Sequence, residues 1–145
     1  MQSHEKRDYR FSAVISPAMD VPGQWISHCL DLDIVSQGND PAHALAMLEE
    51  AVTLCVLDDL LDGLDPRQVR APAPDESWSV MWRAYGSEGE RYDGGLPGAG
   101  ATTDYVYIVP MRMIFTQEKR ETPPQFDVPA VMRRRRGELV GTQAH

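Results

Sequence analysis

The acids, histidine and cysteine between His28 and Asp40 are the residues of this sequence whose types could do chemistry. The run reads HCLDLDIVSQGND and places three carboxylates close to an imidazole and a thiol. Such groups are the common metal ligands and acid–base catalysts of enzymes. Whether they can act together depends on the strands and the helix that carry them.

Alternating hydrophobicity predicts three short strands around this run. Residues 10–16 (RFSAVIS), 24–29 (QWISHC) and 33–37 (DIVSQ) alternate as half-buried strands do, and the proline- and glycine-rich PAMDVPG has turn chemistry. Short links between them predict an antiparallel meander. His28 and Cys29 are neighbours on the second strand, so their side chains point to opposite faces and cannot bind one metal together.

Asp40 and Pro41 predict the start of a helix that runs to about Leu57. An aspartate N-cap accepts the free amides of the first turn, and proline fits the first helical position. A rotation of about 100° per residue predicts a sheet-facing stripe of Leu45, Leu48, Val52 and Cys55. The far side contains Met47, Leu54 and Leu57 and should be covered in part by the later insertion or by a second subunit. Asp59 falls inside the apolar arc, so we expect the regular face to end before it.

The predicted strands and helix account for most of the acids by a structural role and not by a catalytic one. Asp40 is a helix cap, and Asp31 and Asp33 flank Leu32 in a solvent-exposed strand connection. The sequence contains no His-x-x-His or Cys-x-x-Cys spacing. We therefore predict no catalytic residue, no metal site and no cofactor. The alternative is a small cytosolic enzyme that uses Cys29 or Cys55 as nucleophile, or the acids as metal ligands.

The distribution of charge is uneven along the chain. Net charge is −8 over 145 residues, yet no Lys or Arg occurs between Arg10 and Arg67, a stretch with ten acids. Such a surface repels nucleic-acid phosphates and attracts a basic partner, or it serves only to keep the protein in solution. Two cysteines make no disulfide framework, and no apolar run could cross a bilayer, so we expect a cytoplasmic protein without membrane contact.

The second half of the chain is less regular. WSVMWRAY is compatible with a helix, in which Trp78, Met81, Trp82 and Tyr85 share one side, or with a strand. Asp75 before it and Gly86 after it favour the short helix, and residues 86–104 are typical of a glycine-rich loop. YVYIVPMRMIF (105–115) is the strongest strand signal, and Pro110 within it predicts an edge strand, a break or a bulge. The arginine run at 133–136 suits a solvated tail, with nucleic-acid contact as the alternative.

Residues 11–61 resemble the HicB family of antitoxins and their stand-alone relatives. The resemblance rests on the order strand, turn and GQWISHCLDLDIVSQGNDPAHALAMLEEAVTL. Its features are an aromatic residue after the turn glycine (Trp25), a C-L-x-L-D-x-x-S-Q-G-like passage (29–38) and a helix with A-L-x-x-L-E-E-A (44–51).

The resemblance implies an α+β fold: a β-β-β-α-β domain like a truncated ribonuclease H fold over residues 9–116. Its core would be 10–61 and 105–115, with an insertion at 67–104. Residues 117–145 would form a C-terminal tail, for which disorder is one open state.

The resemblance also implies an antitoxin that forms a homodimer or larger homo-oligomer and neutralises HicA, a small basic toxin that cleaves RNA. DNA binding is doubtful, because too few residues follow Phe115 for a helix-turn-helix. Contact with the partner is expected at Trp25, His28, Asp31 and Asp33. An orphan scaffold without a toxin partner is a further alternative.

Overall fold

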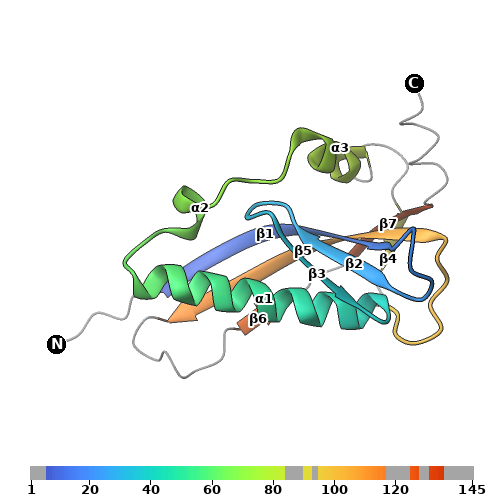
Figure 1. Cartoon of the computed structure of the whole chain (residues 1–145), viewed down its shortest axis with the longest axis horizontal. Coiled ribbons are helices and arrows are strands. Elements are labelled where there is room, and N and C mark those ends of the chain that lie inside the picture. Colours follow the sequence, from blue (N-terminus) through green and yellow to red (C-terminus); the bar gives the residue numbers. More distant parts are fainter. Residues whose placement is uncertain (1–5, 84–89, 93–94, 117–124, 128–130, 136–145) are drawn as a thin grey trace.

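The computed structural model describes residues 6–83, 90–92, 95–116, 125–127 and 131–135. They form an α+β fold in which one long helix lies along an antiparallel sheet (Figure 1). The strands follow the order β3-β2-β1-β5-β7-β4, with β6 also paired to β5. The strands are β1 (Lys6–Pro17), β2 (Trp25–Cys29), β3 (Ile34–Gly38), β4 (Glu90–Tyr92), β5 (Tyr105–Thr116), β6 (Gln125–Asp127) and β7 (Val131–Arg135). The helices are α1 (Pro41–Leu61), α2 (Pro66–Val69) and α3 (Asp75–Arg83). None of these helices combines the length and the apolar character needed to cross a bilayer.

The predicted meander of three strands is confirmed. β2 pairs antiparallel with β1 and with β3, so that Cys29 lies opposite Ala13 on one side and Ile34 on the other. β5 joins the other side of β1 over ten paired positions, from Lys6 with Thr116 to Ile15 with Tyr107. The side chains on one face of these strands are buried beneath α1 and form the main core.

α1 begins as the sequence predicts and ends later. The Asp40 side chain accepts a hydrogen bond from the His43 backbone N–H at 2.7 Å, and Pro41 follows the cap. Leu45, Leu48 and Val52 are buried as expected. Two expectations are wrong.

Val56, and not the half-buried Cys55, completes the stripe that faces the sheet. The helix also continues past Leu57 to Leu61, because Asp59 is buried together with a partner, Arg70. An acid inside the apolar arc is tolerated when a basic side chain neutralises it.

β5 corrects the expectation for Pro110. The strand is central in the sheet and runs unbroken through the proline, which lies opposite Ser12 of β1. On its other side β5 pairs with β7 at Tyr105–Ile108 and with β6 at Arg112–Ile114. The described pairings leave a gap at 109–111, and such a gap can hold a residue without an amide hydrogen.

α3 confirms the short helix expected in the insertion and lies across the other face of the sheet (Figure 1). Met81 packs with Leu30, Val106 and Ile108 in a second, smaller core. Trp78 is partly buried there, whereas Trp82 is exposed, and Tyr85 lies outside the described residues. α1 therefore covers one face of the sheet, and α3 covers part of the other.

The C-terminal residues differ from the expected tail. β6 and β7 extend the sheet, and β7 contains Arg133, Arg134 and Arg135 of the arginine run. The Arg133 guanidinium lies 4.3 Å from the centre of the Tyr105 ring. Glu90–Tyr92, expected in a loop, form β4 beside β7. Long-range pairing has overridden the local sequence preference in both segments.

Candidate functional site

Asp31 lies in the link between β2 and β3 and is tied to the neighbouring strand. Its Oδ1 accepts a hydrogen bond from the Ser12 backbone N–H at 2.6 Å. Desolvation raises the pKa of this half-buried carboxyl, although the bond from Ser12 acts in the opposite direction. Asp31 therefore has a structural role in holding the link against β1.

His28 and Asp33 form a pair at the surface. The His28 Nε2 lies 2.7 Å from the Asp33 Oδ1, and both side chains are partly exposed. Asp33 has a φ of 53°, in the left-handed region that aspartate enters more readily than most residues. By strand register, His28 lies between Val14 and Val35, on the face of the sheet opposite α1.

Trp25 and Cys29 point to the other face and belong to the main core. Trp25 is 2% exposed, and its ring lies 6.1 Å from that of Tyr107. Cys29 is fully buried, and burial raises the pKa of its thiol to about 12. A thiol in this state is protonated at neutral pH and is a poor nucleophile.

The four expected contact residues thus do not form one surface. The expectation for Trp25 is wrong: the side chain is buried in the core, so a partner could reach it only if the core opened. Asp31 is engaged by Ser12, and only the pair of His28 and Asp33 is presented to solvent. The alternation of side chains along β2 separates Trp25 from His28.

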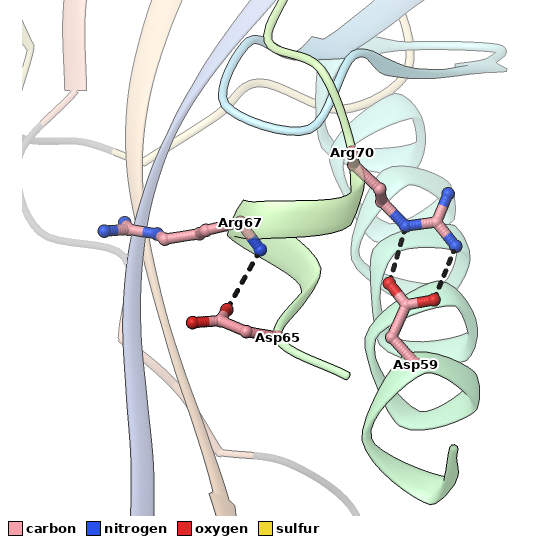
Figure 2. A network of polar contacts seen from close by, with 4 residues as sticks. All are labelled: Asp59, Asp65, Arg67 and Arg70. Atoms are coloured by element: carbon pink, nitrogen blue, oxygen red, sulfur yellow. Dashed lines mark hydrogen bonds and ion pairs between the residues drawn. The ribbon is translucent and has the colours of Figure 1, made fainter. Parts of the chain in front are cut away.

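A group of four charged residues fixes the end of α1 to α2 (Figure 2). Arg70 donates from Nε and from one terminal nitrogen to both Asp59 oxygens, at 2.8 and 3.2 Å. Asp65 accepts from the Arg67 backbone N–H at 3.0 Å. The Arg67 side chain extends away from this contact, donates to the Arg10 carbonyl at 2.6 Å and covers the Phe11 ring at 5.4 Å.

The chain that follows α2 crosses to the opposite face of the sheet. The Ala73 N–H donates to the Leu30 carbonyl at 2.8 Å, and the Trp78 indole nitrogen donates to the Ala73 carbonyl at 3.1 Å. These bonds hold the segment between α2 and α3 against the link between β2 and β3. The first part of the insertion therefore leaves the outer side of α1 open.

Three apolar side chains are exposed along that open side. Met47, Leu54 and Leu61 have exposed fractions of 36%, 63% and 57%. Their spacing of seven residues places them within about 20° of one line along the helix, directly opposite the buried stripe. We call these three residues the outer stripe of α1. The sequence places Met47 and Leu54 on the far side of the helix. It misses Leu61, because the helix is expected to end near Leu57.

Acidic side chains flank the outer stripe. Glu50 and Asp58 lie about 40° to either side of its line, and both are exposed. α1 contains two glutamates, two aspartates and no Lys or Arg. Asp58 and Asp62 stand at the C-terminal end, where the helix dipole is also negative. This side of the molecule therefore combines apolar surface with negative charge.

An open cleft of about 480 Å³ lies at the N-terminal end of the outer stripe. The β1–β2 turn, the end of β3 and the start of α1 line it, with Gln24, Gln37, Gly38, His43 and Met47 among the lining residues. Asn39 donates its backbone N–H to the His43 Nδ1 at 2.9 Å, which orients the imidazole. Gly38 is required there, because a Cβ would lie 2.4 Å from the Ala44 nitrogen.

The described residues contain no cluster of three or more His, Cys, Asp and Glu side chains that could hold a metal ion. Comparison with protein-family models, with curated proteins and with solved structures yields no match to this chain.

Proposed function

We propose that this protein is a protein-binding module of the HicB antitoxin kind, which neutralises a small basic toxin that cleaves RNA. The resemblance of residues 11–61 motivates the proposal. The order β1, β2, β3, α1 and β5, with β5 beside β1, agrees with the β-β-β-α-β arrangement that the resemblance implies.

The observation that carries the proposal is the exposed acidic surface. Asp20, Asp33, Glu50, Asp58 and Asp62 are exposed in a stretch, residues 11–66, that contains no Lys or Arg. Within the described residues, Asp59 is the acid of this stretch that forms an ion pair with an arginine, Arg70. The remaining acids leave a negative field that can act on a binding partner.

A basic RNA-cleaving enzyme is a chemically suitable partner for such a field. A protein that binds RNA needs positive charge to meet the phosphates. An acidic protein can compete for that same positive surface, and opposite charges speed the encounter of the two proteins. We propose the exposed acids Glu50 and Asp58 of α1 as contact residues, and the pair of His28 and Asp33, on the other face of the sheet, as a separate contact.

The enzyme alternative has less support from the described residues. Cys29 is buried with a raised thiol pKa, which leaves the half-buried Cys55 as the candidate nucleophile. Among the residues that the structure describes, no histidine is hydrogen-bonded to Cys55: His28 pairs with Asp33, and His43 accepts from Asn39. An orphan scaffold without a toxin differs from our proposal only in lacking a partner.

The test begins with a tagged copy of the chain, expressed in its native host and used to recover bound proteins. We expect a small basic protein that is released by high salt, cleaves RNA when isolated and loses this activity when the chain is added back. A recovered protein without ribonuclease activity, or one that the chain does not inhibit, would contradict the proposal.

We also propose that the protein self-associates through the edge strand β3. Its sequence, IVSQG, contains no charge and no proline, the features that usually protect an edge from pairing. Light scattering at micromolar concentration should give more than the monomer mass of 16.2 kDa. Val35→Lys should restore the monomer, and a monomeric parent would exclude this interface.

A further inference from the structure

α1 is apolar on two opposite sides, which is unusual for a helix at the surface. Leu45, Val52 and Val56 face the sheet, whereas the outer stripe of Met47, Leu54 and Leu61 faces away from it. A surface helix usually has charged or polar residues on the solvent side, and a helix that is apolar all round is usually covered. The outer stripe therefore indicates a surface that another element covers.

The charges beside the outer stripe restrict what can cover it. A second copy of α1, packed antiparallel about Leu54, would place Met47 opposite Leu61, with the two Glu50 side chains on one flank and the two Asp58 side chains on the other. That arrangement brings like charges together along both flanks and would be disfavoured. A helix with Lys or Arg on its flanks would instead form opposite-charge pairs with Glu50 and Asp58.

We propose that the outer stripe of α1 is the docking site for a basic amphipathic helix of the partner protein. Apolar side chains of that helix, repeated every seven residues, would pack against Met47, Leu54 and Leu61. Basic side chains beside them would meet Glu50, Asp58 and Asp62. This inference rests on the proposed function and identifies the surface and the type of element that are recognised.

The length and shape of the stripe fit a helical partner. Met47 and Leu61 are fourteen residues apart, so the stripe extends over about 21 Å, or four turns of a helix. Side chains that recur every seven residues stay on one side of a helix, so a second helix can follow the stripe along its length.

The terminal turn of α1 adds a second attraction for basic side chains. Asp58, Asp62 and the helix C-terminus all contribute negative potential, whereas Asp59 forms an ion pair with Arg70. An antiparallel partner helix would place its N-terminus, which is positive, near this end. We therefore expect the antiparallel orientation of the bound helix.

The probe is a synthetic peptide of about twenty residues with leucine at the seam positions of each heptad and lysine on both flanks. Fluorescence anisotropy of the labelled peptide measures binding to the full chain, and circular dichroism measures helix formation on binding. A second peptide has glutamate in place of every lysine. We expect the lysine peptide to bind more tightly, by about tenfold or more, and its affinity to fall with added salt.

Variants of the chain locate the site. Leu54→Asp should weaken binding of the lysine peptide by about tenfold or more, because an exposed apolar contact is lost and a charge is buried. Val69→Asp is the matched control: Val69 is 49% exposed on α2, outside the stripe, and its replacement should leave affinity unchanged. Glu50→Lys combined with Asp58→Lys should reverse the preference in favour of the glutamate peptide.

Four results would contradict the proposed docking site. Equal binding of both peptides, or equal loss in the Leu54→Asp and Val69→Asp variants, would overturn the inference. So would a homodimer that Leu54→Asp dissociates, since the stripe would then belong to a second copy. If the chain still inhibits a recovered ribonuclease after Leu54→Asp, the docking site is wrong while the proposed function stands.

Discussion

Removal of Arg70 should destabilise the protein, because it leaves a carboxylate buried without its partner. The Asp59 side chain is 9% exposed and the Arg70 side chain 30%, and two hydrogen bonds join them. The cost of breaking an ion pair is about 3–5 kcal/mol when both groups are buried and about 0–1 kcal/mol at the surface. With one group buried and one partly exposed, we expect Arg70→Met to cost about 2 kcal/mol.

Urea denaturation followed by circular dichroism measures this loss. With a slope of about 2 kcal/mol per molar urea, the midpoint should fall by about 1 M. In a thermal melt, the midpoint should fall by roughly 4–8 °C for a domain of this size. Arg112→Met is the matched control, since Arg112 pairs with Asp8 at 2.7 Å in an exposed position. Its midpoint should change little.

A double variant separates charge from packing. When Asp59 is replaced by leucine together with Arg70→Met, no buried charge remains, and most of the lost stability should return. Equal midpoints for the Arg70→Met variant, the Arg112→Met variant and the parent would refute the reasoning. The segment from α2 to α3 would then be held by other contacts than this ion pair.

Three further predictions concern the core and its buried acids. Val52→Asp places an unpaired charge at a fully buried position under the sheet and should cost about 3–5 kcal/mol in a urea titration; a parent-like midpoint would show that α1 packs by another face. Asp31→Asn keeps an acceptor for Ser12 and removes a carboxylate whose pKa is raised by desolvation. Because the folded pKa is raised, the native charge weakens the fold above the unfolded pKa, so the variant should be at least as stable at pH 7, with any gain lost below about pH 4; a variant that is much less stable at pH 7 would contradict this. Cys29 is buried, with its thiol pKa raised to about 12, and Cys55 is half-buried. In the folded protein, a thiol reagent at pH 8 should therefore leave Cys29 unlabelled, and Cys29 should react only after unfolding. Rapid labelling of Cys29 in the native state would be inconsistent with the core.

The sequence by itself determined the elements whose signals are local. Alternation defined the first three strands, and the cap at Asp40 with Pro41 defined the start of α1. The short helix from Asp75 was also indicated by its N-terminal acid. In each case residues a few positions apart decide the backbone conformation, so no distant contact has to be known.

The tertiary structure alone decided how distant segments pair. Pro110 lies in a central strand, at a gap between the described pairings of β5 with β7 and with β6. Asp59 remains helical, because Arg70 returns to neutralise it. Arg133 to Arg135 belong to a strand, because β5 supplies the neighbouring ladder.

The candidate site divides in the same way. Composition shows that residues 11–66 are acidic, but the spatial arrangement decides which acids are free to meet a partner. Trp25 is lost to the core and Asp31 to a bond with Ser12, whereas Leu61 joins Met47 and Leu54 on one exposed line. The physical reason is that burial and pairing depend on segments that are far apart in the chain, and a local pattern contains no information about which of them will meet.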